Sequence, residues 1–191
     1  MKFLIIFMGL TFSHLSNSAT LTLDFSGNLL GATDIDISGS LYDVSFLDGS
    51  CAQVYNGCNS NNDFIFNSNQ AELASQALLS QVFIDSTSGT FDTSVSLING
   101  CESFDECKVY TAFGTNWEWG NVQIADNNSI ESGDSVYYGG VHPTIVEFSN
   151  IENSTWATWS PVTPVPLPAS IWIFISGLLG IISLGVKRVK A

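Results

Sequence analysis

Four cysteines are the side chains whose spacing most directly suggests chemistry. Cys51 and Cys58 have six residues between them, and Cys101 and Cys107 have five. A four-thiolate zinc site usually contains tight Cys-x-x-Cys pairs, and neither spacing matches that pattern. Four cysteines allow three disulfide connectivities. We expect Cys51–Cys58 and Cys101–Cys107, because the members of each pair are close in the chain, and each closed loop would stabilise the fold by roughly 2.5 kcal/mol.

Histidine-based catalysis has little support in the sequence. His14 lies in the segment assigned below to a signal peptide, so His142 is the one histidine left in the folded region. It follows Gly139-Gly140 and precedes Pro143, a context typical of a turn. No Gly-x-Ser-x-Gly motif accompanies it, so a serine hydrolase would lack the frame that its nucleophile needs. We therefore expect no catalytic residue and a protein that is not an enzyme.

The most suggestive binding residues are two tryptophans around a carboxylate, Trp117-Glu118-Trp119. If this stretch is a strand, Trp117 and Trp119 share one face and Glu118 points to the other. The simpler interpretation is a buried tryptophan pair with a solvated Glu118, and the sharper one is a sugar-stacking platform. A secreted glycosidase is a further alternative, because that chemistry needs only two carboxyls at a set separation.

Calcium is the cation that the many carboxylates suggest, because it prefers oxygen ligands. The turns expected at 59–63 and 126–128 are rich in Asn and Asp. Asp34-Ile35-Asp36 begins like an EF-hand loop, but Ser45 stands where the twelfth-position Glu should be, and the isoleucine pattern indicates a strand. We assign no metal site and expect no cofactor.

Charge is distributed unevenly along the chain of 191 residues. The formal net charge is −13, and the sequence pI is about 4.1. All 18 acidic residues lie between Asp24 and Glu152, where Lys108 is the only basic residue, so this interval carries 17 net negative charges. Such a region repels phosphates, which excludes a nucleic-acid partner. An aromatic content of 12% also excludes a disordered acidic tail.

The two ends of the chain are apolar and basic. Residues 1–19 have a lysine, an apolar stretch and then small polar residues, which is the layout of a secretory signal peptide. Residues 169–186 contain no charge and are numerous enough for one transmembrane helix. The tail 187–191 follows directly, and its basic cluster predicts the cytoplasmic side of the membrane. That cluster consists of Lys187, Arg188 and Lys190.

Between domain and membrane, residues 160–168 contain four of the five prolines and are expected to form a stiff, extended linker. The motif Val165-Pro166-Leu167-Pro168-Ala169, an apolar segment with three glycines and a basic end together resemble the PEP-CTERM sorting signal in its VPLPA variant. Leu167 stands where the commoner form has Glu, which fits that variant. The resemblance covers residues 165–191.

The resemblance implies a bacterial protein of two-membrane cells, exported to the periplasm and recognised at its tail by an exosortase. It also implies cleavage near Pro166–Pro168, delivery to the cell surface or extracellular matrix, and a link to exopolysaccharide or biofilm. The alternative is a type I membrane anchor that is never cut, because a helix of this length would span in either case. We expect a non-enzymatic, exosortase-sorted protein with exopolysaccharide as a candidate partner.

The exported region, residues 20–159, is expected to be a mainly β (α+β) domain of antiparallel strands with one amphipathic helix. Alternating apolar and polar residues predict strands near 21–26, 35–37 and 42–46, with a turn or bulge at Gly39. Apolar residues at helical spacing predict a helix over 70–82, capped by Asn69 with Glu72. Later strands are expected at 109–113, 116–124, 136–138, 144–148 and 155–159.

Overall fold

The structure is a computed structural model, and it describes residues 18–116, 119–129, 133–142 and 146–163. The predicted signal peptide up to residue 17, Trp117, the sorting motif, the predicted span and the basic cluster lie outside these ranges. In the part of the chain that is described, no helix is both long and apolar enough to cross a membrane.

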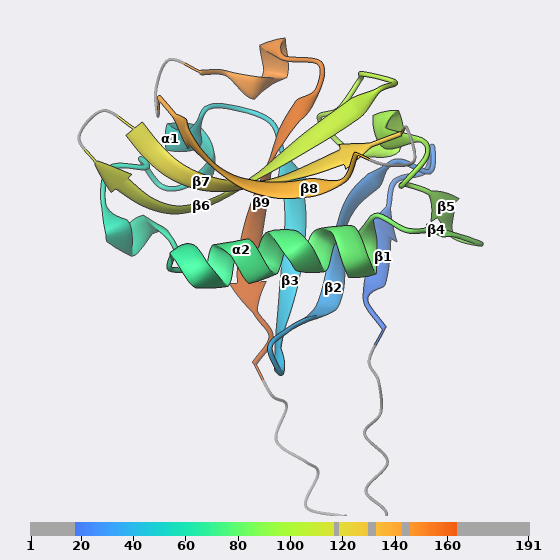
Figure 1. Cartoon of the computed structure of the whole chain (residues 1–191), viewed down its shortest axis with the longest axis horizontal. Helices are drawn as coiled ribbons and strands as arrows, with labels where there is room; N and C mark the ends of the chain where they lie inside the picture. Colours follow the sequence, from blue (N-terminus) through green and yellow to red (C-terminus); the bar gives the residue numbers. More distant parts are fainter. Residues whose placement is uncertain (1–17, 117–118, 130–132, 143–145, 164–191) are drawn as a thin grey trace, which may run out of the picture.

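A seven-stranded sheet in the order β1-β2-β3-β9-β6-β7-β8 forms the centre of the domain (Figure 1). Neighbouring strands are antiparallel except for β6 and β9, which pair in parallel through Lys108–Tyr110 and Ser154–Trp156. The predicted mainly β class, with one principal helix among the described residues, is therefore confirmed. The strands are β1 Thr20–Leu23, β2 Leu29–Ile37, β3 Ser40–Leu47, β6 Glu106–Asn116, β7 Trp119–Asn128, β8 Ser135–Val141 and β9 Ser154–Pro161, with a separate ribbon of β4 Asp85–Ser86 and β5 Gly89–Thr90.

The hairpin of β2 and β3 forms where the sequence changes its alternation. Ile37 pairs with Ser40, and the two residues between them have positive φ angles, 54° at Ser38 and 85° at Gly39. Two consecutive left-handed residues match the twist of a tight β-hairpin. The turn predicted at Gly39 is therefore confirmed.

Helix α2 spans Ser68–Ala77 and continues as a wider π turn, η2, over Leu78–Val82. Asn67 caps it: its side-chain oxygen accepts from the Gln70 backbone N–H at 3.0 Å, and the Gln70 side chain accepts from Asn67 at 3.1 Å. The predicted cap at Asn69 is wrong by two residues, because Asn67 and Gln70 make the reciprocal pair. The predicted helix end at Val82 agrees with the end of η2.

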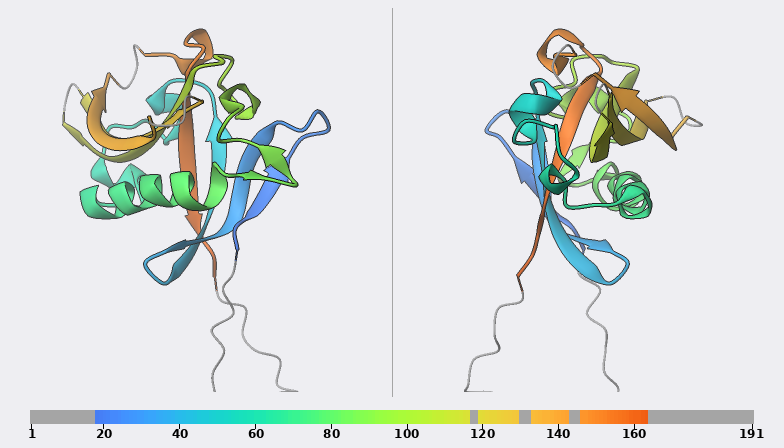
Figure 2. Two further views of the ribbon diagram at one scale, coloured as in Figure 1. Left: turned by 45° about the vertical axis from the view of Figure 1, so that its right-hand side comes forward. Right: turned by 90° about the vertical axis from the view of Figure 1, so that its left-hand side faces the viewer.

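One hydrophobic core lies between α2 and a face of the sheet, and Figure 2 shows the helix on that side of the strands. Three buried alanines of α2 allow the helix axis to approach the sheet closely. On the sheet side, the packed apolar residues come from β3, β6 and β7. The packed residues are Ala71, Ala74, Ala77 and Leu78 of the helical segment and Val44, Phe46, Val109 and Ala125 of the sheet.

A second core covers the opposite face of the sheet and contains the aromatic residues Phe64, Phe148 and Trp156. Trp156 is fully buried at its centre and stacks on Phe148, with ring centroids 4.6 Å apart. The indole N–H of Trp156 donates to the Gly49 carbonyl at 2.9 Å. The short elements beside this core are α1 Cys51–Val54, η1 Asn61–Asp63 and η4 Phe148–Asn150, whereas η3 Val95–Leu97 packs in the first core.

The strand predicted over 144–148 is wrong at its C-terminal end, because Phe148 begins the helical turn η4. Residues 143–145 lie outside the described ranges. Before this turn, Glu147 forms only an isolated antiparallel bridge with Ser50. The Phe148 ring packs between Trp156 and Tyr110, with its centroid 4.5 Å from that of Tyr110, so its burial accompanies the helical turn.

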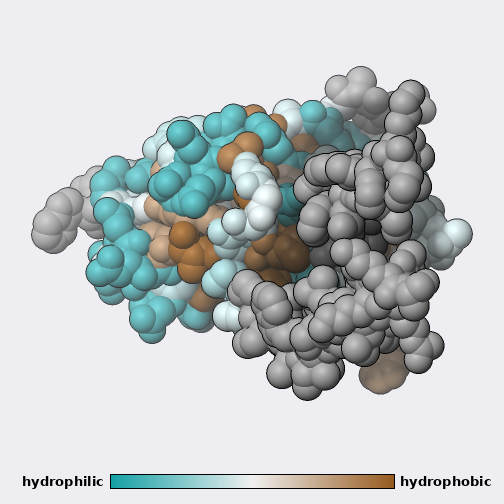
Figure 3. Space-filling model, turned by 90° about the horizontal axis from the view of Figure 1, so that it is seen from below, coloured by the Kyte–Doolittle hydropathy of each residue, from teal (hydrophilic) through white to brown (hydrophobic). Residues whose placement is uncertain are grey.

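The described chain begins and ends at the same end of the molecule, and η4 lies at the opposite end (Figure 1). Strand β9 runs to Pro161, and the Val162 backbone N–H donates to the Leu41 carbonyl at 2.9 Å. The first residues of the predicted 160–168 linker therefore belong to the sheet. Pro161 is tolerated there because it pairs only with β3. Viewed from below in Figure 3, apolar side chains are exposed among hydrophilic ones on the coloured part of the surface.

Candidate functional site

Trp119 lies at a hairpin end, where β6 stops at Asn116 and β7 begins at Trp119. The predicted strand over 116–124 is therefore divided between β6 and β7, and Trp117, the other member of the predicted tryptophan pair, lies outside the described residues. The hairpin is closed by Asn116, whose side-chain oxygen accepts from the Trp119 N–H at 3.1 Å. The indole of Trp119 is 47% exposed, so the simpler interpretation, a buried tryptophan pair, is wrong for this residue.

Beside Trp119 lies a pocket of about 350 Å³, called the Trp119 pocket below. The His142 ring meets the indole edge-on, with centroids 6.1 Å apart. Gly140 of β8 leaves room next to the indole because it carries no side chain: a Cβ there would lie 3.8 Å from the Trp119 ring. The lining residues are Lys108, Tyr110, Trp119, Ile124, Gly139, Gly140, Val141, His142, Val146, Phe148, Ile151, Asn153 and Ser154.

One side of the Trp119 pocket is formed by aromatic rings that the core holds in place. Phe148 and Tyr110 line it, and both rings pack against the buried Trp156, which also anchors to the backbone of Gly49. Burial also raises the pKa of the Tyr110 hydroxyl, so the phenol stays neutral over the physiological range. This side of the pocket therefore offers rigid apolar surface with a neutral hydroxyl.

The polar end of the pocket contains Lys108, but the positive charge of this lysine is already paired with a carboxylate. Lys108 Nζ forms a salt bridge with Glu106, and the Asn153 amide donates to the same carboxylate. The hydrogen bond from Lys108 holds the pKa of Glu106 below its usual range. Burial raises the pKa of the nearby Asp126 carboxyl, on which the Lys108 charge also acts. The pocket thus has no unneutralised cation among its described lining residues.

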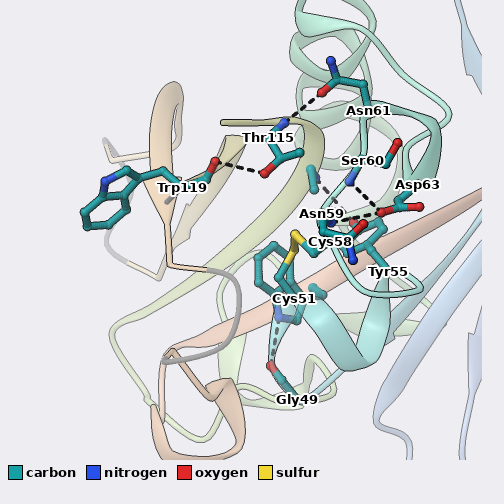
Figure 4. The surroundings of a disulfide bond; sticks show 12 residues. Gly49, Cys51, Tyr55, Cys58, Asn59, Ser60, Asn61, Asp63, Thr115 and Trp119 are labelled. Atoms are coloured by element: carbon teal, nitrogen blue, oxygen red, sulfur yellow. Dashed lines mark hydrogen bonds between the residues drawn. A yellow bond between two sulfur atoms is a disulfide. The ribbon is translucent and has the colours of Figure 1, made fainter. Parts of the chain in front are cut away.

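The two predicted disulfides are confirmed. Cys51 pairs with Cys58, and Cys101 pairs with Cys107, each with Cα atoms 5.7 Å apart. The first bridge lies against β7 directly next to Trp119, because a Cβ at Gly120 would lie 3.4 Å from the Cys58 sulfur. Figure 4 shows the Cys51–Cys58 bridge beside the hairpin that carries Trp119. This disulfide therefore helps to position the candidate site.

The candidate calcium turns have other roles in the structure. Residues 126–128 are part of strand β7 rather than a turn. In the other segment, the Asp63 carboxylate accepts from the backbone N–H groups of Asn59 and Ser60, each at 3.0 Å, and so caps η1. Among the described residues, no group of three or more His, Cys, Asp or Glu side chains is placed to hold a metal ion.

Comparison with known proteins yields no assignment: no protein-family model, curated protein or solved structure matches the chain. The function is therefore inferred from the residues of this chain and their geometry.

Sequence reasoning identified Trp119 but missed His142, Lys108 and Asn153 as its neighbours. They follow β8, belong to β6 and precede β9, respectively, and only the pairing of distant strands brings them together. One local signal was available at the hairpin. Asn116 precedes the turn and Gly120 follows it, and Asn and Gly are typical turn residues.

Proposed function

We propose that this protein is a non-catalytic exported protein, delivered by its signal peptide, held in the inner membrane by its C-terminal helix and sorted by an exosortase. The observation that carries the proposal is the position of the sorting motif: Val165 follows the last strand, which ends at Pro161, by only a few residues. The two disulfides support export to an oxidising compartment. The folded domain would then extend outward from the membrane, with η4 farthest from the point of attachment (Figure 1).

Mass spectrometry of the mature protein from cells with an active exosortase tests this proposal. We expect a mature chain that lacks residues 171–191, and we expect Pro166→Ala together with Pro168→Ala to retain them. Pro161→Ala is the matched control, because it changes a proline of β9 outside the motif and should be processed normally. A native mature chain that still carries residues 171–191 would contradict exosortase processing and favour a permanent anchor.

The exported domain has a second candidate function, binding of a neutral carbohydrate at the Trp119 pocket. The observation that favours it is the half-exposed indole at the edge of a pocket of about 350 Å³, a size typical of small-molecule sites. Apolar faces of sugars stack on such a ring, and Asn153, Ser154 and His142 supply polar atoms around it. The described lining contains no carboxylate, so we do not propose a glycosidase here.

Titration of the full chain in detergent with neutral glucan, galactan and mannan hexasaccharides tests carbohydrate binding. We expect Trp119→Ala to weaken binding about tenfold, equivalent to about 1.4 kcal/mol, through loss of the stacking surface. Phe104→Ala is a matched control because Phe104 is 81% exposed and lies outside the described pocket lining. Equal affinities for the native chain and Trp119→Ala, or no binding of any neutral hexasaccharide, would refute this function.

A further inference from the structure

A second pocket adjoins the backbone of Trp119 and is lined only by uncharged polar residues among those described. It has a volume of about 320 Å³ and is called the asparagine pocket below. One side comes from the segment after the Cys51–Cys58 bridge and the other from the end of β6. The lining residues are Asn59, Ser60, Asn61, Thr115 and Asn116.

Two asparagines of this pocket are oriented by the backbone. Asn61 Oδ1 accepts from the Thr115 N–H at 3.0 Å, and Asn116 Oδ1 accepts from the Trp119 N–H at 3.1 Å. A backbone N–H can only donate, so each amide must turn its oxygen inward. The Nδ2 groups of Asn61 and Asn116 have no hydrogen-bond partner among the described residues. They are therefore fixed donors that remain available to a ligand.

The asparagine pocket and the Trp119 pocket meet at the same hairpin end, because Asn116 lines one and Trp119 lines the other. Asn116 and Trp119 are paired across the hairpin, so their side chains extend from the same face of the two strands. Thr115 lines the asparagine pocket, and its hydroxyl donates to the Trp119 carbonyl at 3.4 Å. Figure 4 shows Thr115 between the indole on one side and Asn61 on the other. Adjacent strands are about 4.8 Å apart, a step that one sugar unit can bridge.

The segment that carries Asn59 and Asn61 is fixed before any ligand binds. The Cys51–Cys58 disulfide holds it at one end, and the Asp63 carboxylate accepts from Asn59 and Ser60 at the other. A site whose donors are already in place loses little conformational entropy on binding. The arrangement is therefore a preformed surface rather than a loop that must order around its ligand.

The charges in and around the two pockets favour a neutral ligand over an anionic one. The asparagine pocket has no charged lining residue among those described, and the salt bridge to Glu106 neutralises Lys108 in the Trp119 pocket. The interval between Asp24 and Glu152 carries 17 net negative charges, which repel a polyanion. Amide donors and an indole face match the hydroxyls and apolar faces of neutral sugars.

We propose that the asparagine pocket is a second subsite that takes the next units of a neutral glycan whose first unit stacks on Trp119. This inference rests on the proposed carbohydrate binding at the Trp119 pocket. It adds that the protein binds several consecutive sugar units within a neutral glycan rather than a single sugar. Affinity therefore rises with chain length, and an acidic glycan of equal length binds more weakly.

The test measures binding of neutral disaccharides and hexasaccharides, and of hexagalacturonate, to the full chain in detergent. The variants are Asn61→Asp and Asn116→Asp, which keep the oxygen that accepts from the backbone and remove the amide donors. Each should weaken hexasaccharide binding about three- to tenfold, from the loss of one or two hydrogen bonds, and leave disaccharide binding unchanged. Asn62→Asp is the matched control: it adds the same charge in the same turn but does not line the pocket.

The outcomes separate this inference from the function on which it rests. If Trp119→Ala weakens binding but Asn61→Asp and Asn116→Asp behave like the native chain, the second subsite is refuted and carbohydrate binding stands. The subsite is also refuted if Asn62→Asp is as damaging as the other two, because the effect would then be one of charge. If hexagalacturonate binds more tightly than every neutral hexasaccharide, the selection of a neutral ligand is wrong. Absence of all neutral binding refutes the carbohydrate function itself.

Discussion

The two disulfides close loops of nearly equal length, so their removal should cost the same stability but have different effects on binding. The paired cysteines are seven residues apart in Cys51–Cys58 and six apart in Cys101–Cys107. Loop-closure entropy gives about 2.5 kcal/mol for each bridge. All four cysteine side chains are buried, so replacement of either pair by alanine removes comparable apolar surface. The expected loss in free energy of unfolding is therefore about 2.5 kcal/mol for each double variant.

Binding should distinguish the two variants. Loss of Cys51–Cys58 frees the segment that carries Asn59 and Asn61, because that bridge is its covalent attachment next to β7. The ratio of hexasaccharide to disaccharide affinity should then fall about three- to tenfold. Cys101–Cys107 belongs to the core under α2, so its loss should leave this ratio unchanged.

Urea unfolding followed by tryptophan fluorescence, together with the two titrations, provides both measurements on the full chain in detergent. Equal destabilisation with a change of ratio only in Cys51→Ala/Cys58→Ala is the expected result. Two results would refute the reasoning: an unchanged ratio in that variant, or an equal fall of the ratio in Cys101→Ala/Cys107→Ala. The first would show that the bridge does not hold the asparagine pocket, and the second that any loss of stability weakens the site.

Three further substitutions test the packing and electrostatics of the domain by urea unfolding. Trp156→Phe should lower the free energy of unfolding by about 2 kcal/mol, because it removes the hydrogen bond from the indole N–H to the Gly49 carbonyl and leaves a small cavity in a fully buried site. A decrease below about 0.5 kcal/mol would contradict this role. Gly31→Ala should cost about 3 kcal/mol, because its Cβ would lie 2.1 Å from the Val44 carbonyl oxygen, and near-native stability would refute that close approach. Burial raises the pKa of Asp126, so the native chain should lose stability as the pH rises through that pKa. The free energy of unfolding of Asp126→Asn should therefore exceed that of the native chain by more at pH 7 than at pH 3. An equal difference at both pH values would contradict the shift.

The sequence predicted best those features that depend on neighbouring residues. The β2–β3 hairpin follows from a change of alternation at Gly39, and both disulfides follow from the short separation of their cysteines. The helix from Ser68 to Val82 follows from apolar residues at helical spacing. Its cap was misplaced because Asn67 and Asn69 offer the same chemistry, and only the burial of one helix face decides between them.

The features that were missed depend on contacts between distant segments. The last strand, β9, inserts between β3 and β6 and pairs in parallel with β6, and no local pattern specifies that order. Phe148 is buried against Trp156 and begins a helical turn at a position where the sequence pattern predicts a strand. The same non-local assembly places His142 next to Trp119, so the pocket could not be predicted from the spacing of its residues.

The acidic charge of the domain and the neutrality of its two pockets have a common consequence. An excess of 17 negative charges between Asp24 and Glu152 repels other anions, including anionic lipid headgroups. Binding in the Trp119 and asparagine pockets then depends on stacking and on hydrogen bonds from neutral amides, which salt screens very little. A domain built in this way can bind a neutral matrix polymer over a wide range of ionic strength, and Lys108, the only basic residue between Asp24 and Glu152, is paired with Glu106 and adds little to long-range attraction.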